Sequence, residues 1–596
     1  MVQKVGIDFG TTNSLISVIT RDNRAKSFVD SDRPHPSVVR YEGERVVCGK
    51  KAWEKMEQRS VGVLGNTVRG PKKLISSETI NVEGRLMTPV EVIGDYIKFL
   101  VKNAEDNDHD QVADLTKAVV TIPVALDGRG RKTLREALLA AGVYVDTFVH
   151  EPLAALYGYF RDQEKFEETI RSYDGCLILV FDWGGGTLDL TLCKVVDGAL
   201  VQVLNRGNNL VGGDYLDEAI VRYVTDEHAK LYGWTADTAL PVNPGMRATL
   251  ITQCEKAKIT LSNPKHERTN IFLPDYFQGE GDSTEIDVWL DRTSLENICS
   301  CLIKQGIDEI ESLLGVDQAN VDPQTIALCL ATGGMVNMPL IKSKLTEIFG
   351  FAALHISNKG DRIISEGAAW IAKDSVDLTL AKPFELVEAR NSLLSIVPEG
   401  TRLPTRGESI QKNQAMYCSD PRDGKAVFTF KRPQMVNKSA AADPRTTYGS
   451  LVVEINPAFP PLEERIALTV TIDDNLIAHC DAIADDCQAP VSIDFYDMEF
   501  ALNALASLNE SGVKNTRTRF LPKKDGVNQL QVRANVIDNN DAWHTVPGEL
   551  LKSENDKRIG LRKPMTQKQE TEYVRYQPCS NCGAKWVKNC CTTGQV

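Results

Sequence analysis

Short apolar runs alternate with amphipathic stretches through residues 1–376. The run KAVVTIPVAL at 117–126 predicts a buried strand, and leucines spaced four apart in 131–143 predict a helix that ends near a glycine. Residues 325–350 predict a strand, a glycine turn and a helix that begins at a proline and closes at a glycine. Strands that alternate with helices are typical of an α/β fold.

Beyond residue 376 the pattern changes to short alternating strands separated by turns rich in Pro, Gly and Asp, which predict a β domain. The following region is mixed and has no assignable fold, although DMEFALNALASL at 497–508 is a helix candidate. We predict a nucleotide-binding domain at 1–376, a linker at 377–384, a β domain at 385–485, a divergent α/β or β region at 486–572, and a cysteine-rich tail at 573–596.

Two segments of the first domain share one plan, in which an apolar strand leads to an aspartate and a turn with glycine and threonine. They read VGIDFGTTNSL (5–15) and FDWGGGTLDL (181–190), and the aspartates are Asp8 and Asp182. Glycines let a tight turn aim successive backbone N–H groups at one phosphate, and carboxylates suit Mg²⁺. The segments are too far apart for one loop, so we expect two related lobes that close on one nucleotide. A third glycine turn, ATGGMVNMP (331–339), is expected near the nucleoside.

A single aspartate before a glycine turn is more often structural than catalytic, and it is the second copy with matching flanks that favours a phosphate site. The chain has neither a G-x-x-x-x-G-K-[ST] nor a G-x-G-x-x-G loop, and it has no HExxH or GxSxG motif. A lone histidine at a strand-to-helix turn, such as His150, is expected to be structural.

Charge and cysteine usage narrow the classes of partner and compartment. With 81 acidic and 68 basic residues, the formal net charge of −13 argues against nucleic acid or an anionic membrane as the main partner. The chain enters a strand at once and lacks an apolar run of roughly 18 residues, so we expect no membrane span and a cytoplasmic location. The 14 scattered cysteines indicate mostly reduced, buried thiols.

Nine segments occur in the order seen in the DnaK-like heat-shock chaperones of the actin-like ATPase superfamily, which residues 1–375 resemble throughout. They are GIDFGTTNS, VTIPV, GRKTLREALLAAG, EPLAALYGY, FDWGGGTLDL, NLVGGDYLDEAI, CEKAKITLS, LATGGMVNMP and SEGAAWIA. A weaker likeness continues to residue 484, through PEGTRLPT and the stretch from VVEINPAFPP to LIAHCDA. The resemblance implies a two-lobed actin-like ATPase domain followed by a β-sandwich-like substrate domain.

Position by position, the resemblance implies an ATPase site. Asp8 and Asp182 correspond to the pair that holds hydrated Mg²⁺. Lys72 corresponds to the catalytic lysine that contacts a phosphate, and a shift of the match by one residue would put Lys73 at this position. The groups that orient or deprotonate the attacking water correspond to Glu151, Thr187 and Asp189. Further positions that bind ATP or ADP correspond to Gly10, Thr11, Thr12, Gly184, Gly185, Gly186, Gly212 and Gly213.

The resemblance also covers the nucleoside end and the route to the second domain. Glu255, Lys258 and Ser262 match positions on the family's adenosine-contacting helix. Gly333 and Gly334 match the glycines whose backbone approaches the base. Asp361 matches another nucleotide-side position. Pro123 and Arg131 correspond to the relay between the nucleotide and the partner domain.

Several positions depart from the family pattern. Met335 and Asn337 stand where the family has a serine and an arginine near adenine, which predicts weaker or remodelled base contacts. Trp183 replaces a leucine or phenylalanine, and Asp377 and Thr379 interrupt the apolar linker that couples ATP to substrate release. No long amphipathic series follows the β domain, so we predict that the family's helical lid is absent or replaced.

The tail contains CSNCGAKWVKNCC, in which four cysteines suggest a tetrahedral zinc site. The ligands would be Cys579, Cys582, Cys590 and Cys591. Adjacent cysteines rarely ligate one ion together, so a redox-active or flexible tail is an equal alternative to Zn²⁺.

These observations favour an ATP-dependent chaperone that binds exposed apolar polypeptide segments, with a J-domain co-chaperone and a nucleotide exchange factor as further partners implied by the resemblance. The altered linker and missing lid favour an alternative, an ATP-binding scaffold or regulator dedicated to one protein partner. A small-molecule kinase of the same superfamily is a third class, but it gives no reason for the β domain.

Overall fold

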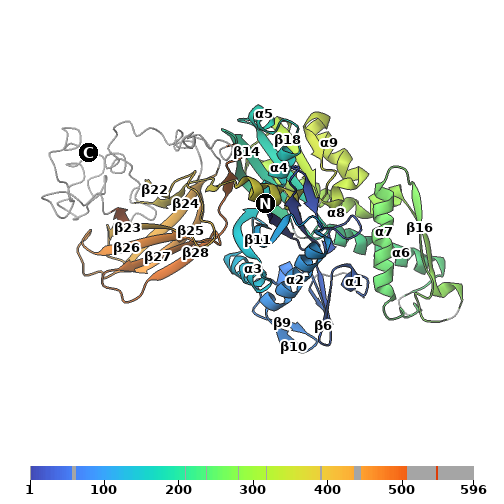
Figure 1. Ribbon diagram of the computed structural model, residues 1–596. Helices are drawn as coiled ribbons and strands as arrows, with labels where there is room; N and C mark the ends of the chain where they lie inside the picture. Colours follow the sequence, from blue (N-terminus) through green and yellow to red (C-terminus); the bar gives the residue numbers. More distant parts are fainter. Residues whose placement is uncertain are drawn as a thin grey trace. The chain divides into compact units, whose positions relative to one another are not determined.

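The computed structural model describes residues 2–56, 62–208, 210–235, 238–279, 281–316, 318–360, 362–388, 392–434 and 445–505, and the backbone of 545–547. It divides into two compact units, one of residues 1–376 with 502–510 and one of 377–501 with 511–596. The helices of the described chain belong to the first unit, and the second is built of strands (Figure 1).

The first unit contains two large sheets, and five strands in each follow the same order. Lobe one orders its strands β12-β11-β1-β2-β3, with β4 beside β2, and lobe two orders its strands β19-β18-β13-β14-β15. In each lobe an antiparallel hairpin leads on to strands that pair in parallel. Lobe one uses β1 (Gln3–Phe9), β2 (Asn13–Ile19), β3 (Ala25–Ser27), β4 (His35–Pro36), β11 (Ala113–Ile122) and β12 (Tyr144–His150). Lobe two uses β13 (Leu177–Trp183), β14 (Leu188–Val196), β15 (Ala199–Asn208), β18 (Ile326–Thr332) and β19 (Leu354–Ile356).

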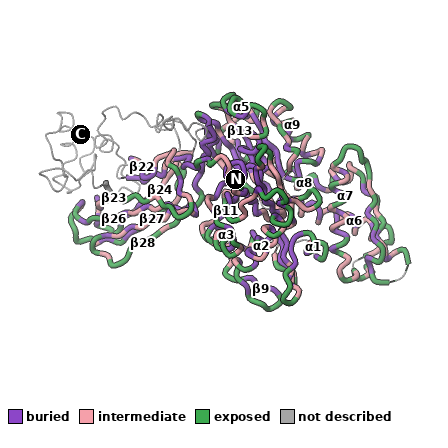
Figure 2. The backbone as a smooth tube through the Cα atoms, viewed as in Figure 1, coloured by how far each residue is buried: buried purple, intermediate pink, exposed green. Residues whose placement is uncertain are grey.

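Three small sheets and ten helices complete this unit among its described residues. The small sheets are β5 (Val38–Glu42), β6 (Arg45–Cys48), β7 (Gly62–Leu64) and β8 (Thr67–Arg69); β9 (Ile80–Val82) and β10 (Arg85–Met87); and β16 (Arg268–Leu273) and β17 (Ile286–Asp291). The helices are α1 (Lys50–Trp53), α2 (Pro89–Asn107), α3 (Gly128–Ala140), α4 (Glu151–Arg161), α5 (Phe166–Ser172), α6 (Gly213–Leu231), α7 (Met246–Ser262), α8 (Arg292–Leu314), α9 (Pro339–Ala353) and α10 (Arg362–Asp374), with short 3₁₀ turns η1 (Pro71–Leu74), η2 (Asp282–Thr284), η3 (Pro323–Thr325) and η4 (Gly334–Asn337). The central strands are buried over most of their length, whereas the outer helices are exposed along one side (Figure 2).

The strand and helices predicted at 117–126, 131–143 and 325–350 are present as β11, α3, β18 and α9. Their ends follow local chemistry. Asp127 caps α3 by accepting the backbone N–H of Gly130 at 2.6 Å, and Pro339 occupies the first turn of α9. Gly142 and Gly350 take positive φ angles of 83° and 76°, which a residue with a Cβ atom adopts only with strain.

Helices α4 and α10 cross each other so closely that their backbones are in contact. A Cβ atom on Gly367 of α10 would lie 1.8 Å from the carbonyl oxygen of Ala154 in α4, and one on Gly158 of α4 would lie 2.8 Å from that of Ile363. Helix α10 also rests on β1, where a Cβ on Gly6 would be 2.2 Å from the amide nitrogen of Ala369. Glycine is therefore required at this crossing.

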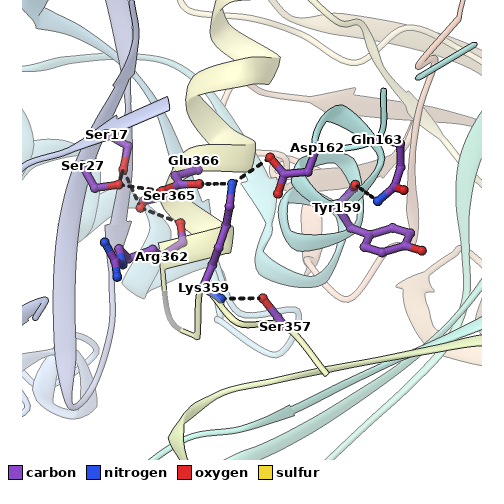
Figure 3. Close-up of polar contacts among 10 residues, drawn as sticks. All are labelled: Ser17, Ser27, Tyr159, Asp162, Gln163, Ser357, Lys359, Arg362, Ser365 and Glu366. Atoms are coloured by element: carbon purple, nitrogen blue, oxygen red, sulfur yellow. Dashed lines mark hydrogen bonds and ion pairs between the residues drawn. The ribbon is translucent and has the colours of Figure 1, made fainter. Parts of the chain in front are cut away.

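The chain passes from lobe one to lobe two after α4 and returns before α10, and Lys359 joins these two connections. Its ammonium lies 2.7 Å from Asp162 at the end of α4 and 2.6 Å from Glu366 in α10 (Figure 3). Glu366 also accepts the hydroxyl of Ser27 at 3.0 Å. Figure 3 shows Ser17 and Ser365 beside this contact, with their hydroxyl oxygens 2.8 Å apart.

The described second unit contains two antiparallel sheets that enclose aromatic side chains. Phe384 and Phe430 on one sheet and Phe495 on the other have ring centroids 5.2 to 5.6 Å apart. Lys382 is buried beside them and donates to Glu499 at 3.0 Å. The sheets are β22-β21-β24-β25 and β28-β27-β26-β23-β30, and the strands of the unit are β20 (Leu378–Leu380), β21 (Phe384–Val387), β22 (Leu393–Val397), β23 (Ile410–Cys418), β24 (Lys425–Pro433), β25 (Arg445–Glu454), β26 (Arg465–Ile472), β27 (Ala478–Ala484), β28 (Val491–Phe495), β29 (Phe500–Leu502, whose last residue belongs to the first unit) and β30 (Thr545–Pro547).

The helix candidate at 497–508 is wrong, because its described part contains the strand β29. The carbonyl oxygen of Glu499 accepts the backbone N–H of Ala381 at 2.9 Å, and that of Ala501 accepts the hydroxyl of Thr379 at 3.4 Å. Pairing with the segment predicted as a linker therefore outweighs the helix propensity of alanine and leucine. The ten described cysteines are free, and seven of them are buried, as expected.

Candidate functional site

Each of the two predicted aspartates is the last but one residue of a strand, at the equivalent place in its lobe. Asp8 on β1 lies opposite Thr121 on the parallel strand β11, and Asp182 on β13 lies opposite Thr332 on the parallel strand β18. The threonines differ in their contacts. Thr121 donates to the carboxylate of Asp8 at 3.0 Å, whereas Thr332 donates to the carbonyl of Gly360 at 3.1 Å. The two lobes therefore place their aspartates on equivalent backbone positions, but the threonines opposite the two aspartates make different contacts.

The glycine turns that follow these aspartates face each other. A Cβ atom on Gly185 would lie 3.0 Å from the hydroxyl of Thr12, and one on Gly186 would lie 3.5 Å from the methyl of Thr11. Gly10 closes its own turn so tightly that a Cβ there would lie 2.0 Å from the carbonyl of Asn13. Backbone from both lobes thus converges at one place, where the N–H of Gly10 donates to the hydroxyl of Ser14 at 3.2 Å and that of Gly184 donates to the carbonyl of Thr187 at 2.9 Å.

Helix α6 begins directly against the lobe-two turn. The backbone N–H of Gly213 donates to the carbonyl of Gly184 at 3.2 Å, and that of Asp214 donates to Gly185 at 2.8 Å. A Cβ on Gly212 would lie 2.4 Å from the same Gly185 carbonyl, so this approach requires glycine. The N-terminus of α6 is therefore fixed to the turn that carries residues 184–186.

The predicted catalytic groups form two close pairs. The ammonium of Lys72 lies 2.6 Å from the carboxylate of Glu151, which begins α4, and both side chains are nearly buried. Thr187 donates its hydroxyl to Asp189 at 2.9 Å. Burial and the nearby Glu151 carboxylate raise the pKa of Asp189 to about 6. Lys73 is exposed, whereas Lys72 is buried in its ion pair.

The described residues predicted at the nucleoside end lie on α7 and at the start of η4. Lys258 is buried and contacts the carboxylate of Asp217 at 2.8 Å and the carbonyl of Gly213 at 3.1 Å. Burial acts to lower the pKa of Lys258, but the Asp217 carboxylate reverses this, and the pKa is raised overall. A Cβ on Gly213 would lie 2.8 Å from the sulfur of Met335. Met335, which differs from the family pattern, thus packs directly against Gly213 of the pair Gly212 and Gly213.

The other residues predicted for the nucleoside end and for metal binding are placed as follows. Glu255 lies one turn before Lys258 on α7, and the hydroxyl of Ser262 donates to the carbonyl of Lys258 in its own helix at 2.9 Å. Gly333 has a φ of 87°, and a Cβ there would lie 2.8 Å from Asp182, while Gly334 faces open space. The structure does not describe Asp361, Cys579, Cys582, Cys590 or Cys591. In the described part of the chain, no group of three or more His, Cys, Asp or Glu side chains is arranged to hold a metal ion.

Trp183 is accommodated by a glycine that the sequence pattern did not single out. The indole is fully buried, and its N–H donates to the carbonyl of Val211 at 2.8 Å. A Cβ on Gly306 of α8 would lie 2.3 Å from the indole ring. The larger ring therefore fills space left by glycine and supports the segment leading to Gly212.

The predicted relay residues belong to one turn. The carbonyl of Pro123 accepts the N–H of Leu126, whose own carbonyl accepts the guanidinium of buried Arg131 at 3.0 Å. Burial and the positive charge of Arg131 lower the pKa of His150 to about 3, so this histidine is neutral. His150 is paired at 2.8 Å with Gln202 of lobe two, which agrees with its predicted structural role.

Duplicated sheets with facing glycine turns define the class of two-lobed, actin-like nucleotide-binding folds. A model of the Hsp70 protein family matches residues 4–504, and the chain therefore belongs to the Hsp70 family. It is 28% identical over 500 residues to Chaperone protein DnaK of Thermosipho melanesiensis, covering 80% of this chain and 77% of that protein. The same identity extends over 504 residues to Chaperone protein DnaK of Thermosipho africanus, with the same coverage. Chaperone protein DnaK of Mycoplasmopsis agalactiae is 28% identical over 428 residues, covering 69% of this chain and 67% of that protein.

Family membership confirms the predicted fold class, an actin-like ATPase fold followed by a β-sandwich. Sequence reasoning missed Arg69, Asp214 and Asp217, which make ion pairs at the edge of the site. Asp214 and Asp217 follow the GG pair at helical spacing, and this is the one local signal that could have indicated them. No helix among the described residues is long and apolar enough to cross a membrane.

Proposed function

We propose that the first unit binds ATP with Mg²⁺ between its lobes and hydrolyses it to ADP and phosphate, and that the nucleotide state controls binding of apolar polypeptide segments by the second unit. The observation that carries the proposal is the meeting of the two glycine turns, where a Cβ on Gly185 would lie 3.0 Å from Thr12. The proposal is supported by membership of the Hsp70 family and by similarity to the DnaK chaperone proteins of the two Thermosipho species.

Asp8 and Asp182 fit a hydrated Mg²⁺ chemically, because each is a carboxylate near the end of a strand, directly before one of the two glycine turns that face each other. The ion would neutralise charge on the phosphates. Backbone of residues 10–12 and 184–186 would bind the phosphate oxygens, and Lys72 would stabilise charge that develops on the γ-phosphoryl group. Pairing with Glu151 holds the ammonium of Lys72 in place for this role.

Glu151, Thr187 and Asp189 would orient the attacking water and accept its proton. Asp189 suits this role because burial and the Glu151 carboxylate raise its pKa to about 6, which makes it a stronger base than an ordinary aspartate. Thr187 holds the Asp189 carboxylate through its hydroxyl. This is a positioning mechanism, as phosphoryl transfer requires.

The second candidate function is recognition of one dedicated protein partner, and the segment predicted as a linker favours it. The hydroxyl of Thr379 donates a hydrogen bond to the carbonyl of Ala501. This polar residue, which interrupts the apolar linker pattern, is therefore bonded within the second unit. Such an ATP-binding scaffold or regulator would recognise one protein and not general peptides. A J-domain co-chaperone, an exchange factor and a cytoplasmic location stay predictions, as do the zinc site and the missing lid.

Single-turnover ATP hydrolysis, measured with and without an unfolded apolar peptide, tests these proposals. We expect hydrolysis that Lys72→Ala abolishes and that peptide changes in rate. Hydrolysis that does not respond to peptide would favour the dedicated-partner function. Failure of the protein to bind nucleotide would overturn both.

A further inference from the structure

An ion pair connects the two lobes at the edge of the candidate nucleotide site. Arg69 ends β8 in lobe one, and its guanidinium lies 2.6 Å from the carboxylate of Asp214 at the start of α6 in lobe two. Arg69 is 1% exposed, and its guanidinium lies 5.0 Å from the ring centre of Trp53. A charge this deeply buried makes a geometrically defined contact, unlike a surface ion pair.

Both partners are rigidly attached to the phosphate-binding segments. Asp214 donates its backbone N–H to Gly185, in the turn of residues 184–186. Arg69 is followed by Gly70, whose N–H donates to the carbonyl of Ser37 at 2.9 Å, and then by the turn that carries Lys72. The ion pair therefore ties the segment holding Lys72 to the glycine turn of the opposite lobe.

Each partner also keeps one polar atom that no described residue satisfies. These atoms are Nη1 of Arg69 and Oδ2 of Asp214, and both are buried. A donor on one residue and an acceptor on its ion-pair partner fit a ligand or a water that offers both functions, such as a hydroxyl group. Their position beside residues 184–186 places that ligand at the nucleotide site.

We propose that Arg69 and Asp214 form an interlobe clasp that closes over the bound nucleotide and slows its release. The inference rests on the proposed binding of ATP and ADP between the lobes. For nucleotide to leave, the lobes must separate, and separation breaks this buried contact. The clasp acts on retention of the nucleotide, and Arg69 and Asp214 are positioning residues for Lys72 and the turn of residues 184–186.

The test is the rate at which a fluorescent ADP analogue leaves the full-length protein when chased with excess ADP. We expect Arg69→Met and Asp214→Asn each to accelerate release about tenfold or more. The double variant should release ADP no faster than the quicker single variant, because all three lack the same contact. Arg40→Met is the matched control. Arg40 lies in the same small sheet and pairs with Glu42 at 3.2 Å inside lobe one, so its loss should leave release unchanged.

Asp214→Asn keeps the shape of the side chain, and it therefore answers the question even if Arg69→Met fails to fold. Unchanged release in Asp214→Asn, additive effects in the double variant, or equal acceleration by Arg40→Met would overturn the clasp while leaving the proposed ATPase intact. Failure of the wild-type protein to bind ADP would overturn the proposed function, and the clasp with it.

Discussion

The ammonium nitrogen of Lys72 lies 2.6 Å from a carboxylate oxygen of Glu151, although the residues come from a 3₁₀ turn and from the first turn of α4. The pair is nearly buried, so its charges interact more strongly than those of a surface pair. The Glu151 carboxylate also raises the pKa of Asp189. Burial is the larger cause of that raised pKa, so Glu151 holds the lysine in place and adds to the basicity that burial gives the aspartate.

Lys72→Ala should slow single-turnover ATP hydrolysis by about 100-fold or more, the usual cost of losing one group that stabilises transition-state charge. The neighbouring Lys73→Ala is the comparison: Lys73 is exposed and reaches the site only through its charge, which lowers the pKa of Asp189, so we expect a much smaller loss of rate. If Lys73→Ala is the more damaging change, the register is displaced by one residue and the Lys72 assignment is wrong.

The hydrolysis rate should depend on the ionisation of Asp189. A base accepts a proton only when it is ionised, so the rate should fall as the pH decreases through about 6. The hydrogen bond from Thr187 lowers the pKa of Asp189, and the Glu151 carboxylate raises it. Thr187→Val should therefore move the midpoint of the pH–rate profile upward, and Glu151→Gln should move it downward. Midpoints that do not move would argue against Asp189 as the titrating group.

His150 should make the folded protein sensitive to mild acid. Its pKa is lowered from 6.5 to about 3 in the folded state, so below pH 6.5 the unfolded chain binds a proton that the folded chain does not. The free energy of unfolding should decrease by up to about 1.4 kcal/mol per pH unit from this residue alone as the pH falls from 6.5 towards 3. Denaturant unfolding of His150→Gln at several pH values should show a shallower decline, and equal slopes would contradict the burial argument.

The helix crossing should tolerate no side chain. Gly367→Ala places a Cβ 1.8 Å from the carbonyl of Ala154, and overpacking of this kind costs about 1 to 3 kcal/mol or more. Gly94→Ala in α2 is the control, because its Cβ would lie 3.6 Å from the nearest atom and alanine favours helix by up to about 1 kcal/mol. Thermal unfolding should show a lower Tm for Gly367→Ala and an unchanged or higher one for Gly94→Ala.

Much of the candidate site could be predicted because its signals are local. Asp8 and Asp182 each precede a glycine turn within a few residues, and glycine is needed there for reasons of backbone geometry that sequence patterns carry. The strand, helix and loop assignments of the first domain follow from the same short-range periodicities.

The contacts that were missed join residues far apart in the chain. Arg69 and Asp214 are 145 positions apart, and nothing in the local sequence of either one indicates the other. The error at 497–508 has a related cause. Ala501 and its neighbours favour a helix in isolation, but pairing with the segment around Thr379 supplies their backbone with partners from elsewhere.

The shared strand order of the lobes has an evolutionary consequence. Each lobe alone supplies one aspartate and one glycine turn, which is half of the proposed phosphate site. The shortest chain able to close such a site would therefore be one lobe in two copies, assembled as a symmetric dimer. A single chain, by contrast, lets the two halves differ. Thr121 donates to Asp8, whereas Thr332 at the matching place donates to Gly360.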